Sequence, residues 1–321
     1  IKQLLNILRQ AESDLINSHP SINSVPYNGL SETNIEKLYM NSEGSCRQMQ
    51  LSQASLYLYA KGEEKGRKPR SAGSVMTGFG VNDIDIQSCI NESSAKTISH
   101  LNYKPIKTDK YLVCFTPEAF LDLIGSFSSL FNARSILDGV SIHDVSCLGT
   151  KIAVPFLTIY DNALHHENIP TFNFDGEGTP KNNITIVKDG VIKNLLHSES
   201  TARKFNVKPT GHASLGAKSS VSPEWIVIEK TNHDTCISNN LNHINTDDKF
   251  ILIDGLNALH AGVKATQGSF SLPFDGWLID RGKKISIEAA TVAGDIKYVL
   301  NNIVQIEDVK KVTNSGISPY I

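Results

Sequence analysis

The sequence predicts an α+β fold in which an N-terminal α/β portion with a central helix precedes a β-rich C-terminal domain. Apolar residues repeat at helical spacing from Ile1 to Leu15 and again from Phe120 to Phe131, so helices come early. From Thr171 onward, short apolar runs separated by turn residues dominate. Such segregation favours α+β over a regularly alternating fold. We expect the 321 residues to form two parts. Residues 1–105 are the remnant of an N-terminal α+β lobe, and residues 106–321 are the β-rich C-terminal domain.

Local signals place the elements of the first half. The chain starts at Ile1 inside an uncapped helix, so we expect a fragment of a longer gene product. Thr116, Pro117 and Glu118 predict the start of the central helix, with an N-cap, a proline at N1 and an acid in the first turn. The other expected elements are strands at 33–40 and 50–60, a loop with at most one strand at 62–80, a helix capped by Asn82 or Asp83, and strands at 110–115 and 149–160.

Residues 171–213 hold the densest set of signals. A Phe-Asp-Gly-Glu-Gly turn at 174–178 precedes two apolar runs, 184–187 and 191–196, and Asp-Gly between them predicts a β-hairpin. Ser198 is placed to cap a helix at 199–205, and a Thr-Gly-His turn follows at 210–212. Further on, we expect strands at 225–230 and 249–254, a hairpin at 277–287 and a helix after Gly294.

Composition excludes several classes of protein. The net charge of −2 gives no overall electrostatic footprint for nucleic acid, and no apolar run reaches the length of a membrane span. The five cysteines are scattered and never form a C-x-x-C pair, so neither a disulfide framework nor a zinc ribbon is expected, and a cytoplasmic location fits best. They are Cys46, Cys89, Cys114, Cys147 and Cys236.

The order of these motifs resembles the TldD/PmbA family, which is named for modulation of DNA gyrase and works in the proteolytic maturation of peptides. The resemblance rests on the 174–178 turn, on Thr210-Gly211-His212-Ala213, on 268–279 (GSFSLPFDGWLI) and on 291–296 (TVAGDI), all in the family's order. Ser269 stands where the family usually has Asp. From this resemblance we expect the family's usual N-terminal lobe to be largely missing from the chain.

The active branch of the family carries H-E-x-x-x-H on its central helix, where two histidines bind zinc and the glutamate activates water. Counting back from Gly149 places the motif on Gly125, Ser126 and Leu130, and no cysteine follows Cys236 to complete the site. The chain therefore resembles the PmbA (TldE) branch, which lacks the motif and pairs with an active TldD-type subunit. This resemblance implies no catalytic residue, no metal and no cofactor in this chain, with zinc only in the partner.

Six residues of the signature are candidates for binding or for an interface. For two of them, Asp175 and Glu177, the sequence favours a structural interpretation as turn-forming and capping acids over two acids held near a site. The candidates are Asp175, Glu177, Arg203, Thr210, Gly211 and His212. Outside the signature, His165-His166-Glu167 is a weaker metal candidate in a loop; its adjacent histidines would point apart on regular structure.

The predicted function is that of a non-catalytic subunit of a TldD-type zinc metalloprotease complex that processes or degrades unfolded peptides. The expected partners are an H-E-x-x-x-H homologue, the unfolded peptide and, in a possible homodimer, a second copy, without nucleic acid or membrane. Two alternatives stay open. One is an independent hydrolase with a relocated site at Asp175, Glu177 and His212. The other is a gyrase-modulating binding protein, which the family name alone suggests.

Overall fold

The computed structural model describes residues 2–168, 171–216, 219–231 and 249–321, and its side chains form two main cores. The smaller core belongs to the first hundred residues and includes Leu15, Leu56 and Leu58, all fully buried. The larger core belongs to the rest of the chain and surrounds the central helix. Among the described residues, no helix is both long and apolar enough to cross a membrane.

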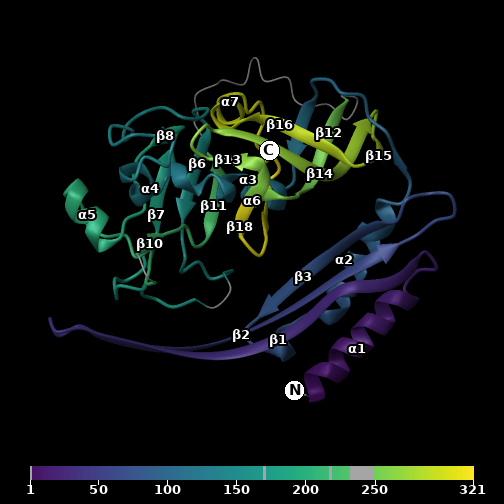
Figure 1. Cartoon of the computed structure of the whole chain (residues 1–321), viewed down its shortest axis with the longest axis horizontal. Coiled ribbons are helices and arrows are strands. Elements are labelled where there is room, and N and C mark those ends of the chain that lie inside the picture. The colour runs from purple at the N-terminus through teal and green to yellow at the C-terminus, as the bar shows by residue number, and fades with distance from the viewer. Residues whose placement is uncertain (1, 169–170, 217–218, 232–248) are drawn as a thin grey trace.

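A long β-hairpin dominates the N-terminal portion (Figure 1). Its strands, β1 and β2, form a three-stranded antiparallel sheet with β3, but β3 covers only the second half of β2. The other half of the hairpin, which we call the arm (residues 31–53), reaches beyond that sheet toward the C-terminal portion (Figure 1). The elements are α1 Lys2–Asn17, β1 Ile22–Met40, β2 Cys46–Gly62, β3 Arg70–Gly78, the 3-10 turn η1 Val81–Asp83 and α2 Ile86–Ser99.

The C-terminal portion has two larger sheets. The six-stranded sheet has the order β17-β18-β11-β6-β7-β8. It consists of β6 Leu157–Asp161, β7 Ile184–Lys188, β8 Val191–Ile192, β11 Ile226–Lys230, β17 Lys310–Val312 and β18 Gly316–Pro319. The other has the order β4-β15-β14-β12-β5, and β13 and β16 also pair with β14. It consists of β4 Tyr103–Lys104, β5 Leu112–Phe115, β12 Phe250–Leu256, β13 Val263–Lys264, β14 Ser269–Asp280, β15 Lys283–Ile287 and β16 Ala290–Asp295.

The central helix, α3 (Pro117–Ser126), packs against both large sheets through β12 and β18. Its apolar face is fully buried at Phe120, Leu123 and Ile124. Burial of these side chains removes apolar surface from water, which stabilises the packing of the helix against both sheets. The remaining elements are η2 Ser128–Leu130, α4 Ala133–Leu137, α5 Glu199–Phe205, α6 Leu259–Gly262, α7 Ile296–Asn301, and the two-stranded pair β9 Ala213–Ser214 with β10 Ser220–Val221.

The α+β class is confirmed, and most local signals are confirmed with it. Thr116 caps α3 with Pro117 at N1, and Ser198 caps α5 through a capping box. Asp189 and Gly190 both have positive φ, at 55° and 75°, as the hairpin turn requires. The second strand of that hairpin is shorter than predicted, because β8 ends at Ile192 and the chain leaves the sheet.

Three other predictions were wrong in detail. The helix expected after Asn82 or Asp83 is capped instead by Asp85, whose carboxylate accepts the Ser88 N–H, and residues 81–83 form a 3-10 turn. The central helix ends at Ser126 rather than continuing to Phe131. Residues 149–156 form no strand, and β6 begins only at Leu157. Cys236 lies outside the described residues.

Candidate functional site

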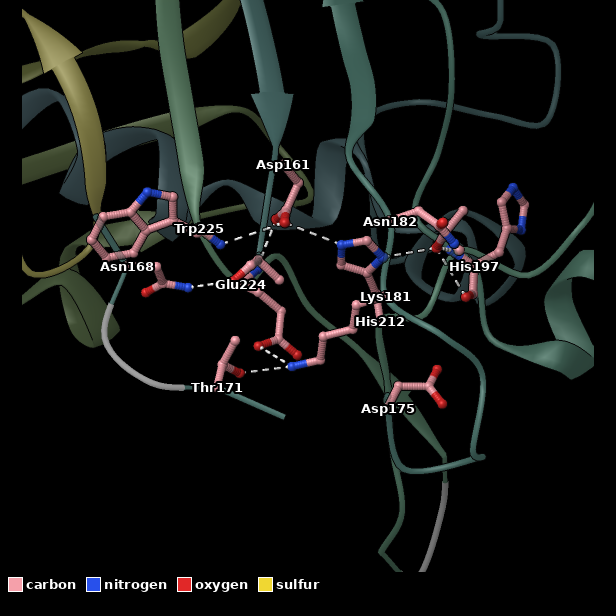
Figure 2. A network of polar contacts seen from close by, with 12 residues as sticks. Asp161, Asn168, Thr171, Asp175, Lys181, Asn182, His197, His212, Glu224 and Trp225 are labelled. Atoms are coloured by element: carbon pink, nitrogen blue, oxygen red, sulfur yellow. Dashed lines mark hydrogen bonds and ion pairs between the residues drawn. The ribbon is translucent and has the colours of Figure 1, made fainter. Parts of the chain in front are cut away.

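A buried polar network joins the Thr-Gly-His turn to the six-stranded sheet (Figure 2). His212 and Asp161 are fully buried at their side chains, and His212 Nε2 lies 3.1 Å from Asp161 Oδ1, within ion-pair range. On the other side of the ring, Nδ1 lies 3.0 Å from the Thr210 hydroxyl. Asp161 also accepts the Glu224 N–H at 2.7 Å. Asp161 therefore ties the turn to the end of β6.

The acid–histidine–hydroxyl order of this network is also the order of a hydrolytic triad, but its hydroxyl is not available. The Thr210 oxygen accepts the His197 N–H at 2.8 Å and donates to the His197 carbonyl at 3.1 Å. Thr210 is 7% exposed, and it does not line the groove of about 1320 Å³ that residues 105–115 and 288–295 border. A nucleophile must reach a substrate carbonyl, so this network is a structural clamp.

Gly211 is required in the same turn by its backbone conformation and by its surroundings. Its φ is +80°, a region that residues with a Cβ rarely adopt. A Cβ at this position would lie 2.5 Å from the Pro180 carbonyl oxygen. The turn thus packs directly on the backbone that follows the 174–178 turn, and the two halves of the signature form one unit.

Asp175 organises the other half of the signature. Its carboxylate is 3% exposed and accepts three backbone N–H groups at 2.9 Å each, those of Glu177, Thr179 and Ala213. The first two bonds close the turn, and the third connects it to β9. Because these bonds occupy the carboxylate, the structure favours the turn-forming interpretation of Asp175 over an acid or base for chemistry.

Glu177 contacts the N-terminus of α5, whereas Arg203 lies in the last turn of that helix. Glu177 accepts the N–H of Glu199, the first helical residue, at 2.7 Å and also the Ser219 hydroxyl at 3.0 Å. It therefore supplies negative charge at the helix N-terminus, where the helix dipole favours it. Arg203 is exposed, and among the described residues its side chain pairs with Glu199 alone, one turn earlier. The structure thus joins Asp175, Thr210, Gly211 and His212, adds Glu177 at their edge, and leaves Arg203 on the surface.

The arm docks on the signature turn, a contact that sequence analysis missed. Lys37 Nζ donates to the Asp175 carbonyl at 3.0 Å, and Arg47 Nε donates to the Gly178 carbonyl at 2.7 Å. The Tyr39 ring covers Gly178, where a Cβ would lie 2.3 Å from the ring. Two segments more than 130 residues apart are thereby joined.

Two lysines near this contact are partly or fully removed from solvent. Lys37 lies over the rings of Phe172 and Phe174, 5.1 and 4.9 Å from their centroids, and burial together with the charge of Lys181 lowers its pKa. Lys181 is 6% exposed and pairs with Glu224 at 2.8 Å (Figure 2). A buried lysine needs such a partner, so this pair helps fix the turn in place.

The residues on which the count back from Gly149 places the family's metal motif have no strong zinc-binding side chain. Gly125 and Ser126 are the last two residues of α3, and Leu130, 1% exposed, lies in the following 3-10 turn. The Ser126 hydroxyl donates to the Leu123 carbonyl one turn earlier. The described residues contain no group of three or more His, Cys, Asp or Glu side chains that could hold a metal ion.

His165 and His166 do not point apart as expected, because the loop stacks their rings 4.5 Å apart. His165 Nδ1 accepts the Glu167 N–H at 3.2 Å, and His166 lies 3.5 Å from the Glu167 carboxylate. His166 is 82% exposed at its side chain. The pair is a surface feature whose polar atoms are partly used within the loop.

Two family models cover nearly the whole chain. The PmbA/TldA metallopeptidase central domain matches residues 1–101, and the C-terminal domain of the same metallopeptidases matches residues 108–321. The chain belongs to the PmbA/TldD family. The resemblance inferred from the signature is confirmed.

Relatives within the family are distant. Metalloprotease PmbA of Escherichia coli O157:H7 is 24% identical over 84% of this chain and 57% of its own length. A PmbA homologue of Buchnera aphidicola is 27% identical over 70% of this chain and 48% of its own. The chain therefore spans about half the length of these relatives.

Solved structures share the fold. A Thermotoga maritima protein described as a modulator of a DNA gyrase superimposes with a TM-score of 0.86 at 24% identity, covering 100% of this chain and 72% of that protein. TldE of Thermococcus kodakarensis has a TM-score of 0.79 at 19% identity, covering 98% and 72%. At this level of identity the likeness shows the architecture, and function has to come from the site.

Proposed function

We propose that this chain is a non-catalytic, TldE-like subunit that pairs with a TldD-type zinc metalloprotease homologue and helps process or degrade unfolded peptides in the cytoplasm. The observation that carries the proposal is the end of α3. Counting back from Gly149 places the two histidines of the active branch on Gly125 and Leu130, whose side chains cannot bind zinc, and its glutamate on Ser126, which cannot serve as a general base. Zinc then belongs to the partner.

The signature residues support a scaffolding role in this proposal. The side-chain oxygens of Asp175 and Thr210 hydrogen-bond to backbone groups, and Asp161 pairs with His212 out of reach of solvent. An independent hydrolase at these residues would need a group that can reach a substrate, and none of them is placed for that. The signature instead holds the arm against the C-terminal portion.

The proposal is tested by mixing this chain with its H-E-x-x-x-H homologue. We expect the two to elute together on gel filtration and to degrade an unfolded peptide. Activity should vanish when the homologue's motif glutamate is replaced by glutamine, because in this proposal that residue is the general base that activates water. Separate elution at micromolar concentrations, with activity of the homologue unchanged by this chain, would contradict the proposal.

A further inference from the structure

The arm contacts the C-terminal portion through one of its two faces. Lys37 lies opposite Met49 in the hairpin, and Tyr39 lies opposite Arg47. Because side chains alternate along a strand, these four share one face. Three of them contact the signature turn as described above, and Met49 Sδ accepts the Asn173 N–H at 3.4 Å. The contact therefore consists of long side chains of the arm on backbone groups of the C-terminal portion.

This contact adds no buried residue to either core. All residues of the arm, 31–53, are exposed or half-buried. The buried residues of the smaller core lie between Ala11 and Ile90, those of the larger core between Phe115 and Ile306, and the two cores share none. A segment with little buried apolar surface opens locally at a lower free-energy cost than a packed core does. The arm can therefore leave the turn while both cores stay folded.

The docked position of Lys37 balances opposing effects. Its ammonium group gains the Asp175 carbonyl and the rings of Phe172 and Phe174. Burial and the charge of Lys181 act in the opposite direction and lower the pKa of Lys37, so the docked site favours the charged form less than water does. The favourable contacts are thus partly offset, which allows Lys37 to dock reversibly.

The other end of the N-terminal portion is held where the chain passes into the C-terminal portion. The chain crosses once, at residues 101–105. The guanidinium groups of Arg67 and Arg70 lie 5.4 and 5.3 Å from the centroid of the Tyr103 ring. Arg67 also donates to the Tyr103 carbonyl at 3.1 Å, and Arg70 donates to the Asp275 carboxylate at 3.2 Å. These contacts make the crossing a pivot for the N-terminal portion.

The distance from this pivot makes the position of the arm sensitive to small rotations. Near the pivot, His100 is 3% exposed and stacks on Trp277 with ring centroids 4.7 Å apart. From Gly62, which pairs with Arg70, β2 runs to Arg47 in the arm, a stretch of about 50 Å at the usual rise of a strand. A rotation of about 10° at the pivot would therefore move the arm by about 9 Å, which breaks its hydrogen bonds.

We propose that the arm is a reversible strap, which swings about the crossing at residues 101–105 and uncovers the signature turn. Opening lifts the Tyr39 ring from Gly178, so access of other molecules to the turn depends on the position of the N-terminal portion. It also releases an exposed contact between pivot and arm, in which the Asn314 amide donates to the Val75 carbonyl at 2.9 Å. The strap operates in the single chain, independently of the proposed pairing with a homologue.

The strap is tested by measuring a distance across it with spin labels on the purified chain. One label is placed on Cys46, which is exposed at the end of the arm, and the other on the exposed position of Lys204→Cys in α5. Cys114 and Cys236 are replaced by serine, and the remaining cysteines are buried. Double electron–electron resonance then gives the distribution of distances between the two labels.

Replacing both Lys37 and Arg47 by methionine removes the donors but keeps long side chains, and it should open the strap. We expect each single replacement to raise the ratio of open to closed chains about tenfold, because each removes a hydrogen bond from a charged group. The double replacement should produce a clear population at longer distances. The matched control is Arg9→Met with Lys61→Met, two exposed residues of the same portion, which should leave the distribution unchanged.

Thermal melting followed by circular dichroism should show that both cores remain folded in the double variant, with a melting temperature close to that of the control. An unchanged distribution of distances in the double variant would overturn the inference. A shift that appears only together with unfolding would overturn it as well, because the arm would then be part of the cooperative fold rather than a strap.

Discussion

Replacing Asp175 tests whether the signature acid is structural. Its carboxylate accepts three backbone N–H groups at 2.9 Å while only 3% exposed. Asp175→Ala leaves three donors without this partner, and one unsatisfied buried donor costs about 1–3 kcal/mol. We expect the free energy of unfolding to fall by about 3 kcal/mol or more, a large part of a typical total of about 5–15 kcal/mol.

The isosteric variant refines the same test. In Asp175→Asn, the remaining oxygen can keep the Glu177 and Thr179 N–H groups, but an amide NH₂ then faces the Ala213 N–H. We expect a loss of about 1–3 kcal/mol, smaller than for alanine. The matched control is Asp138→Ala, which removes an exposed acid whose side chain pairs with exposed Arg134 and which should cost less than about 0.5 kcal/mol.

Urea denaturation followed by circular dichroism measures all three variants. The reasoning would be refuted if Asp175→Ala unfolded at the same urea concentration as the control. It would also be refuted if the asparagine variant were less stable than the alanine variant, because the order follows from how many N–H groups lose their acceptor. Loss of the turn should also release Lys37 and Arg47, so proteolysis within the arm should become faster in Asp175→Ala.

The remaining predictions concern a turn, a titration and metal content. Gly190→Val should destabilise the fold by more than about 1 kcal/mol in the same urea assay, because φ is +75° and a Cβ would lie 2.4 Å from a carbonyl oxygen; an unchanged midpoint would contradict the hairpin. Burial lowers the pKa of His197 to about 4, so the unfolded chain binds the proton more readily than the folded chain. The free energy of unfolding should therefore fall by up to about 3 kcal/mol as the pH drops from about 6.5 to 4. His197→Phe should flatten that dependence whereas exposed His166→Phe should not, and equal slopes would contradict the assignment. Elemental analysis should find no stoichiometric zinc; one zinc per chain would indicate a site at His165 or His166.

Local chemistry made parts of the fold predictable from sequence. Asp189-Gly190 and Ser198 act within a few residues of their own position, so a hairpin turn and a helix cap could be read directly. The arm was harder to predict, because its partly buried and exposed positions alternate without a matching pattern of apolar and polar residues. Lys37 is partly buried there, whereas Leu38 and Met40 are exposed. Their predicted ranges covered only part of each strand.

Sequence analysis named most residues of the site but not the contacts that join them. Asp161 gave no local signal, since it is an ordinary strand residue until the fold brings His212 to it. The docking of Lys37 on the Asp175 carbonyl joins two segments that sequence patterns treat separately. Such contacts depend on how whole elements pack, which periodicity and spacing do not contain.

Peptide hydrolysis by this chain alone tests the central claim most directly. The purified chain is incubated with an unfolded peptide, with and without a chelator, and products are followed by mass spectrometry. We predict no cleavage under either condition, because Gly125, Ser126 and Leu130 offer neither a metal-binding set nor a group to activate water. Robust cleavage that resists the chelator would contradict the non-catalytic role and favour an independent hydrolase.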